Sequence, residues 1–248
     1  MSDIPTAFQS AQYADTYPLG IEQHWWTLAR SEIVRRAVLS FPMARILDVG
    51  CGPGLMVAHL RQLGMDCWGC ELGSPEPREA AKNFVWTNAD ATALESDFRK
   101  SVGIILLLDV LEHLPDPASF LSRLIGAFPA LNGLVATVPA RMELWTAWDD
   151  RYGHFLRYQR RQLAQLYERS GIETKTLRYF FQALYPPLFL ASRLNARPTS
   201  ISAPRILWPH TILAKWFVLE SALPGLGWIP GSSLIATGVP RRTRARGN

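Results

Sequence analysis

The residues with the clearest chemical use in this sequence are three closely spaced glycines, Gly50, Gly52 and Gly54. They follow a short apolar run that ends in Asp48, and a helical pattern follows them up to residue 60. A short apolar run followed at once by clustered glycines is typical of a buried strand that enters a tight turn. Because glycine has no Cβ, the backbone of such a turn can approach a bound ligand closely. The next helix would direct its free N–H groups at that ligand, so the stretch predicts a nucleotide-type site.

An acidic residue, Glu71, closes the next apolar stretch, 21 residues after Gly50. In Rossmann-like folds this separation places a carboxylate on the hydroxyls of a ribose. No lysine follows the glycines as in a Walker loop, and they lack the G-x-G-x-x-G spacing of the dinucleotide fingerprint. The alternatives are a glycine-rich turn that only connects a strand to a helix, and a Glu71 side chain that is solvated.

The run D-V-G-C-G-P-G at 48–54 resembles motif I of the class I S-adenosylmethionine (SAM) methyltransferases. The resemblance implies that the loop faces the amino-acid end of SAM and that S-adenosylhomocysteine is the product. N-A-D-A at 88–91 resembles the family's adenine-binding step, although an Asp that opens a turn would give the same pattern. The cofactor-binding residues that we expect from this resemblance are Asp48, Gly50, Cys51, Gly52, Gly54, Glu71, Leu72, Asp90, Ala91, Asp109 and Arg30.

The fully apolar stretch 103–110 predicts a central parallel strand, and polar residues stand at its carboxyl end, where α/β folds place their chemistry. The run D-V-L-E-H-L-P-D at 109–116 resembles motif IV of a group that includes ubiquinone-pathway O-methyltransferases. The resemblance implies that Asp109, Glu112 and His113 face the methyl acceptor. Asp109 and His113 are catalytic candidates, and His113 could act as general base because it titrates near neutrality. The alternatives are a structural role for His113 and a divalent ion on these three side chains; we expect no metal.

A helical pattern between residue 20 and the proline at position 42 precedes the glycine loop. Its residues E-x-H-W-W-x-x-x-R resemble a signature that precedes motif I in a subgroup of the same methyltransferases. The resemblance implies that this helix covers the SAM pocket, with Arg30 near the SAM carboxylate, for which a planar guanidinium is well suited. The plain alternative is an amphipathic helix that only covers the sheet.

The segment 139–158 is too irregular and too aromatic for a plain connection. It resembles a subfamily segment of the form T-V-P…L-W…D…G-H-x-R-R-Y, in which this sequence has Leu156 in place of the first arginine. On this basis we expect an acceptor loop, with His154 either as a second candidate base or as a buried residue that holds the loop. The substrate-binding candidates are Trp26, Trp145, Asp150, Arg157 and Tyr158.

The 248 residues have the composition of an ordinary globular protein, with 48% hydrophobic and 19% charged residues and a net charge of +5. Part of this charge is the run 241–246, which could contact phosphates or an anionic membrane but is more often a solvated end. The odd number of cysteines, three, and the lack of a signal-peptide pattern favour a cytoplasmic location for the protein. Cys67 and Cys70 form a C-x-x-C on a predicted strand, where they point to opposite faces; we therefore expect core thiols and no chelation.

Short apolar strands alternate with helical patterns, which predicts an α/β doubly wound, Rossmann-like sheet. The resemblance adds seven strands, the last antiparallel. Apolar stretches before the last strand are too interrupted to span a bilayer and predict a helical insertion, either a plain cap or a roof over a lipid-linked acceptor met at a membrane surface. The expected parts are a leader with a lid helix (1–43), a SAM-binding core (44–182) with the acceptor loop (139–158), a helical cap (183–231), and the last strand with a basic tail (232–248).

Together these features predict an enzyme that transfers a methyl group from SAM to a small, hydrophobic or lipid-linked acceptor, with oxygen as the favoured atom. The alternatives are a nucleic-acid or protein methyltransferase, a SAM-binding module without catalysis, and a nucleotide oxidoreductase. Nucleic acid is disfavoured because the basic residues gather at the end of the chain and not in a stripe with stacking aromatics. We expect a monomer or a homodimer, without a transmembrane segment and with peripheral membrane contact at most.

Overall fold

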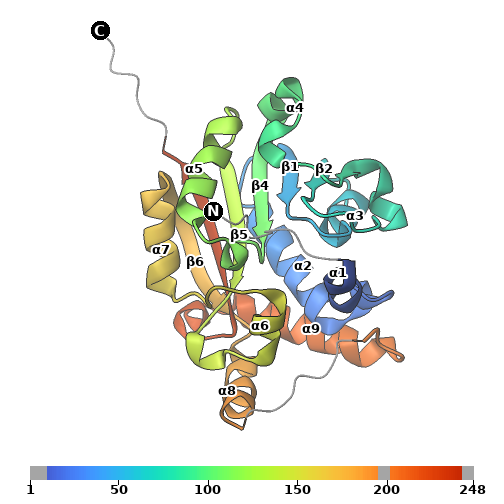
Figure 1. Cartoon of the computed structure of the whole chain (residues 1–248). Coiled ribbons are helices and arrows are strands. Elements are labelled where there is room, and N and C mark those ends of the chain that lie inside the picture. Colours follow the sequence, from blue (N-terminus) through green and yellow to red (C-terminus); the bar gives the residue numbers. More distant parts are fainter. Residues whose placement is uncertain (1–9, 195–201, 242–248) are drawn as a thin grey trace.

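The computed structural model describes residues 10–194 and 202–241, which form one seven-stranded sheet with helices on both faces (Figure 1). The strand order is β3-β2-β1-β4-β5-β7-β6. The strands from β3 to β5 in this order pair in parallel, whereas β7 runs antiparallel to both of its neighbours. The predicted Rossmann-like fold with an antiparallel last strand is confirmed.

The elements alternate along the chain as the pattern of apolar residues predicts. The strands are β1 (Arg45–Val49), β2 (Cys67–Cys70), β3 (Val85–Trp86), β4 (Val102–Leu108), β5 (Gly133–Pro139), β6 (Ile172–Phe180) and β7 (Ser233–Pro240). The α-helices are α1 (Ser10–Thr16), α2 (Trp25–Val38), α3 (Leu55–Gln62), α4 (Ser96–Ser101), α5 (Pro117–Ala127), α6 (Ala147–Tyr152), α7 (Arg160–Arg169), α8 (Tyr185–Arg193) and α9 (Leu207–Ala222).

Strand β4 lies in the middle of the sheet and is buried along its whole length. Its side chains alternate between two apolar clusters: Ile105 and Leu107 pack on the face covered by α5 and α7, and Ile104 and Leu106 on the face covered by α2, α3 and α9. The unbroken apolar run in the sequence therefore reflects burial on both faces.

The two cysteines of the C-x-x-C confirm the prediction of core thiols. Cys67 and Cys70 are free and buried, and they belong to the clusters on opposite faces of the sheet. Side chains three residues apart on a strand cannot approach each other, which is why the pair does not form a chelating site.

The third strand is short and ends at Trp86. Asn88 has a left-handed backbone with φ of 52°, which turns the chain away from the sheet. The leader contains α1 within its described part, a helix that the sequence analysis did not predict.

The helix expected from residue 20 begins only at Trp25. Gly20 has a left-handed φ of 84° that ends the preceding turn, and the His24 imidazole accepts a hydrogen bond from the Trp26 N–H at 3.3 Å. This is an N-cap by a histidine in place of the usual Ser, Thr or Asp. The Trp25 N–H donates to Nδ1 of His210 at 3.1 Å, which ties the start of α2 to α9.

The helical insertion expected before the last strand forms α8 and α9, although its residues 195–201 lie outside the described chain, as do the basic-tail residues 242–248. Figure 1 shows α9 crossing α2 below the sheet edge. The ring of Trp25 lies 5.0 Å from that of Phe217 and 5.8 Å from that of Phe181, so α9 is packed onto the core through aromatic contacts. Within the described residues, none of the helices has the length and apolar character that crossing a membrane requires.

Two neighbouring aromatic residues of α9 test this packing. Phe217→Ala should lower the free energy of unfolding by about 3 kcal/mol, because Phe217 is 3% exposed and its loss leaves a cavity. Trp216→Ala is the matched control, with a side chain 57% exposed, and should change stability by less than about 1 kcal/mol. Urea unfolding followed by circular dichroism measures both; equal losses would contradict the packing described here.

Candidate active site

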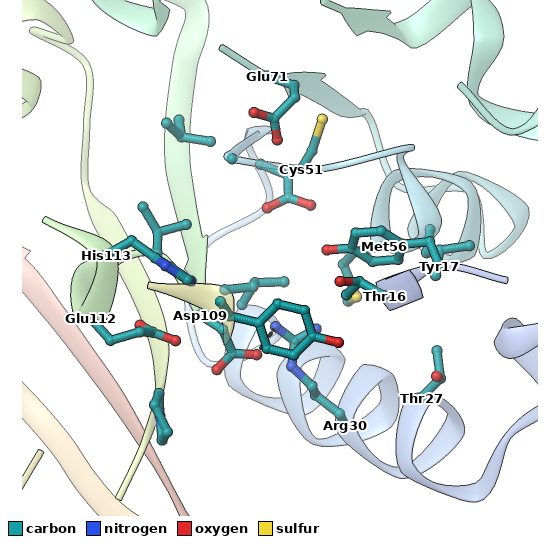
Figure 2. A pocket seen from close by; sticks show the side chains of 18 of the residues that line it. Thr16, Tyr17, Thr27, Arg30, Cys51, Met56, Glu71, Asp109, Glu112 and His113 are labelled. Carbon is teal, nitrogen blue, oxygen red and sulfur yellow. Dashed lines mark hydrogen bonds and ion pairs between the residues drawn. The ribbon is translucent and has the colours of Figure 1, made fainter. Parts of the chain in front are cut away.

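A cavity of about 1730 Å³ opens at the carboxyl ends of β1, β2 and β4. Because the strand order reverses between β1 and β4, the connections after these two strands leave on opposite sides and a crevice forms between them. Figure 2 shows side chains from the glycine loop, α1, α2 and the turn after β4 around this space. Ligand pockets usually measure roughly 300–1000 Å³, so the cavity has room for a cofactor together with a second molecule.

The glycine loop has the backbone that the sequence predicts. Gly50, Gly52 and Gly54 all have positive φ, at 76°, 54° and 82°. A Cβ on Gly50 would lie 2.7 Å from a methyl group of Val110, and one on Gly52 would lie 3.0 Å from the ring of Tyr17. Both the conformation and the close approach therefore require glycine at these positions.

The carboxylate of Glu71 is buried and faces the glycine loop. Oε2 accepts a hydrogen bond from the Gly52 N–H at 2.8 Å, and Oε1 accepts one from the Gly73 N–H at 3.0 Å. The Tyr13 side chain also hydrogen-bonds to Glu71. An ionised carboxylate can accept about four hydrogen bonds, so Glu71 retains acceptor capacity that is suited to a hydroxyl of a ribose.

Asp48 ends β1 with a side chain that is only 2% exposed. Its Oδ1 is buried and has no hydrogen-bond partner among the described residues, and the residue lines the cavity. Burial raises the pKa of Asp48 to about 7, against the opposing charge of Arg30. A buried acceptor without a partner is costly, which points to a ligand with a donor group at this place.

The residues expected to bind adenine, Asp90 and Ala91, also line the cavity. Oδ1 of Asp90 accepts hydrogen bonds from the N–H and the hydroxyl of Thr92, so this carboxylate caps a short 3₁₀ turn (Ala91–Ala93). Ala91 is buried, whereas Leu72 is 49% exposed at the cavity. The capping role and a ligand contact can coexist at Asp90 because the contacts to Thr92 use only one of its two oxygens.

Two of the cavity-lining residues are free thiols, Cys51 in the glycine loop and Cys70 at the end of β2. Burial is the main cause that raises the pKa of both, to about 12 for Cys70 and well above the usual value for Cys51. The Cys70 thiol donates to the Ala89 carbonyl at 3.1 Å.

Helix α1 lies over the glycine loop and was missed by the sequence analysis. A Cβ on Gly73 would lie 2.2 Å from the hydroxyl of Tyr13, just as one on Gly52 would meet Tyr17. Asp15 forms an ion pair with Arg151 of α6, so α1 also contacts the acceptor loop. The two tyrosines four residues apart were the available signal, because this spacing puts both on one face of a helix.

Arg30 of α2 forms an ion pair with Asp109, with 2.5 Å between Nη2 and Oδ2. The Thr137 hydroxyl donates to the other oxygen of Asp109 at 3.1 Å, and Asp109 has a left-handed φ of 58°. The Nε of Arg30 is buried without a partner among the described residues. The guanidinium, expected beside a SAM carboxylate, is thus bound on one side by Asp109 and lines the cavity with the other.

Asp149, which the sequence analysis did not single out, organises the acceptor loop. It is fully buried; its Oδ1 lies 2.8 Å from Nδ1 of His154, and Arg157 donates to both oxygens at 2.8 and 2.9 Å. Burial alone would raise the pKa of Asp149. The hydrogen bonds from His154 and Arg157 outweigh this effect and lower the pKa to about 2. His154 and Arg157 both line the cavity.

His113 and Glu112 stand next to His154. The ring centroids of His113 and His154 are 4.7 Å apart in an edge-to-face arrangement, and burial together with His154 lowers the pKa of His113 to about 4. Both carboxylate oxygens of Glu112 are buried without partners among the described residues, and burial raises the pKa of Glu112 well above its usual value.

The side chains that could hold a cation are not the three considered from the sequence, which were Asp109, Glu112 and His113. The ligand atoms of Glu112, His113 and His154 lie within 4.8 Å of one another, whereas Asp109 is engaged by Arg30. Burial favours the neutral form of the Glu112 carboxyl by raising its pKa. The expectation of no metal stays a prediction.

Three of the expected acceptor residues do not line the cavity. The Trp145 indole donates to the exposed Asp150 at 3.0 Å, and this pair lies on the outer side of the loop. Tyr158 is 3% exposed, and its hydroxyl donates to the Leu111 carbonyl at 3.1 Å. Trp26, the remaining aromatic candidate, lines the cavity beside Arg30, whose guanidinium lies 5.0 Å from the indole centroid.

The comparison with known families defines the class of this protein. Residues 23–177 match the family model described as a methyltransferase domain, which is more than half of the chain. The chain belongs to this family, and it is a SAM-dependent methyltransferase of class I.

Its similarity to individual curated proteins is more distant. The chain is 26% identical over 181 residues to the ubiquinone biosynthesis O-methyltransferase of Saccharophagus degradans, covering 64% of this chain and 74% of that protein. It is 34% identical over 85 residues to the protein of the same name from Colwellia psychrerythraea, covering 30% of this chain and 33% of that one. The match thus spans only about a third of the length of several of these relatives. For the protein of the same name from Pseudomonas fluorescens, the share is 35%.

Solved structures show the same fold at low sequence identity. A chain from the complex between the Haloferax volcanii Trm112 methyltransferase activator and the putative methyltransferase has a TM-score of 0.56 and 16% identity, covering 95% of this chain and 97% of that one. The plantazolicin methyltransferase BamL, solved with a substrate analogue and S-adenosylhomocysteine, has a TM-score of 0.54 and 13% identity, covering 94% of this chain and 90% of that one.

Removing the carboxylate of Glu71 tests the ribose assignment. Glu71→Ala should weaken SAM affinity by roughly 1–3 kcal/mol, because the ribose hydroxyls would lose their acceptors. Isothermal titration calorimetry with SAM and with S-adenosylhomocysteine measures the change, and Glu79→Ala, an exposed acid on the other side of the loop region, is the control. An unchanged affinity for Glu71→Ala would remove ribose binding from this residue.

The buried Asp149 predicts a particular pH dependence of stability. Its pKa is lowered on folding from 3.8 to about 2, so its contribution, roughly 2 kcal/mol, is fully present above pH 4 and is lost as the pH falls toward 2. Asp149→Asn should therefore be less stable than the wild type at pH 7 by at least this amount, and the difference should shrink below pH 4. Urea unfolding at a series of pH values measures it, with the exposed Asp150→Asn as control; a difference that does not vary with pH would contradict the assignment.

Proposed function

We propose that this methyltransferase acts on a hydroxyl oxygen of a small, hydrophobic, lipid-linked acceptor and that His154 is the general base. The observation that carries the proposal is the Asp149–His154 pair, which presents an oriented imidazole at the wall of a cavity large enough for two ligands. Each further residue of the site supports one part of this assignment.

The cavity fits SAM as the methyl donor. The buried Oδ1 of Asp48 lacks a partner among the described residues, and Asp48 lines the cavity together with Gly50 of the glycine loop. Bound SAM would supply an activated methyl group on a sulfonium centre. We assign its ribose hydroxyls to Glu71, its adenine to Asp90 and Ala91, and its amino-acid end to the glycine loop, Asp48 and Arg30.

His154 meets the geometric requirements of a base. Asp149 accepts a hydrogen bond from Nδ1, which favours the tautomer that carries its proton on Nδ1 and leaves Nε2 free to accept another. The hydroxyl proton of the acceptor passes to Nε2 as the oxygen becomes nucleophilic. Because Arg157 binds the same Asp149 carboxylate in a bidentate manner, the imidazole is held by a carboxylate that cannot easily rotate.

His113 and Asp109 are assigned positioning roles in this proposal. With a pKa of about 4, His113 is neutral near pH 7, and its ring interacts with the backbone of Tyr152 and Gly153, so it holds the acceptor loop against the turn after β4. Asp109 holds the Arg30 guanidinium at the cofactor side of the cavity.

The acceptor side of the cavity is apolar. Trp25, Trp26, Leu184 and Leu188 line it, which suits a hydrophobic molecule better than a charged one. Oxygen as the acceptor atom is supported by the name of the curated relatives, ubiquinone biosynthesis O-methyltransferase. We further propose that the enzyme acts in the cytoplasm as a monomer or homodimer and does not use nucleic acid as a substrate.

Transfer of a labelled methyl group tests the function. The purified protein is incubated with methyl-labelled SAM and a catechol that bears a short isoprenoid tail; the same ring with amines in place of hydroxyls, total RNA and an unfolded protein are the competing acceptors. Label on the catechol oxygen is the expected result. Label on the amine analogue, the RNA or the protein, with none on the catechol, would overturn the proposal.

Replacing each histidine separates the base from its neighbour. His154→Gln should lower kcat for the catechol by about 10²–10⁴, the usual contribution of a general base, with SAM affinity by calorimetry unchanged. His113→Gln is the matched control and should lower kcat by less than about tenfold. The reverse order of the two effects would transfer the role of base to His113.

A further inference from the structure

We propose that the outward side of α9 docks on the surface of an anionic lipid membrane. This side, the α9 outer face, is formed by Trp208, Ile212, Trp216, Leu219 and Leu223. The inference deepens the proposed function, because it gives the route by which a lipid-linked acceptor would reach the cavity.

The α9 outer face is a continuous apolar stripe. The four residues from Trp208 to Leu219 follow one another at intervals of four, four and three, which places them on one side of the helix, and Leu223 follows directly after its end. Their exposed fractions are 66%, 59%, 57%, 57% and 47% in sequence order. Large apolar side chains that are exposed singly are common, but a contiguous stripe with two tryptophans marks an interaction surface.

The buried side of α9 is apolar in the middle of the helix. Ala214, Phe217 and Val218 pack on the core, where α9 contacts α2, and Glu220 is buried near the end of the helix. Large apolar side chains therefore occupy both sides of α9, and water is an unfavourable environment for those on the outer side. Because α9 is too short to cross a bilayer, an orientation in the plane of the interface is the one that buries its outer side.

The charges around the α9 outer face favour a lipid surface over a protein. Between positions 183 and 219 the sequence contains no Asp or Glu, while Arg193, Arg205 and Lys215 are exposed. Basic side chains beside tryptophans match the anionic headgroups and the interfacial region of a membrane. A symmetric contact with a second copy would instead bring these cations together without a carboxylate to pair with them.

The elements that carry and precede the α9 outer face also line the cavity, although the residues of this face do not. Leu184 and Leu188 line it around α8, Pro204 in the segment before α9, and His210 in the first turn of α9. A membrane beneath α9 would therefore lie beside the apolar end of the cavity. An acceptor with a hydrocarbon tail could then enter with its polar ring first while its tail remains in the lipid.

Flotation with lipid vesicles tests the proposal. The full-length protein should bind vesicles of phosphatidylcholine with phosphatidylglycerol at least tenfold more tightly than vesicles of phosphatidylcholine alone. The double variant Trp208→Ser, Trp216→Ser should lose at least tenfold of this binding, and Lys215→Gln should weaken it about fivefold. Met43→Ser, Leu63→Ser is the matched control, since these apolar residues are exposed elsewhere, at 74% and 53%, and it should bind as the wild type does.

Three results would overturn the proposal: no vesicle binding by the wild type, equal binding by the double variant, or a dimer in light scattering that the double variant dissociates. The last result would identify a second copy as the partner. Methyl transfer to a catechol without a tail keeps the two proposals apart, because the double variant should retain it. Loss of vesicle binding with transfer intact leaves the proposed function standing, whereas binding without transfer by the wild type overturns the function alone.

Discussion

The ion pair between Arg30 and Asp109 connects the parts of the structure that form the cavity. It joins α2 to the end of β4, and Thr137 extends the connection to β5 through the same carboxylate. Asp109 adopts a left-handed backbone that is unfavourable for a residue with a side chain, and these two partners supply the contacts that hold it there. Since α9 packs on the first turn of α2, the position of the helical insertion over the cavity also depends on this pair.

The two halves of the cavity are built in different ways. On the cofactor side, backbone groups and acids stand at strand ends, where the sheet fixes their positions, as Glu71 does by accepting N–H groups from two loops at once. On the acceptor side, the groups stand on α6 and the loop after it, and a single buried carboxylate, Asp149, holds them. The first half is common to a fold with many functions, and the second half is the part that we propose to select the methyl acceptor.

The sequence predicted the sheet, its helices and the residues around the glycine loop, because each of these depends on neighbours close in the chain. It did not predict contacts that depend on distant elements, such as Arg30 with Asp109 or Tyr17 over Gly52. Helix α1 is too short to be recognised from periodicity and is stabilised by tertiary contacts. The choice of Asp150 over Asp149 failed for a related reason: on a helix of six residues, only the packed structure shows which of two adjacent acids points inward.

The two thiols at the cavity, Cys51 and Cys70, are potential targets of the methyl donor. A methyl donor strong enough to modify an oxygen would also alkylate a thiolate, which is the more nucleophilic group. Cys51 and Cys70 line the same cavity, yet burial raises the pKa of both thiols and so favours their protonated form. The packing around the glycine loop thus disfavours the thiolate that a methyl donor would alkylate.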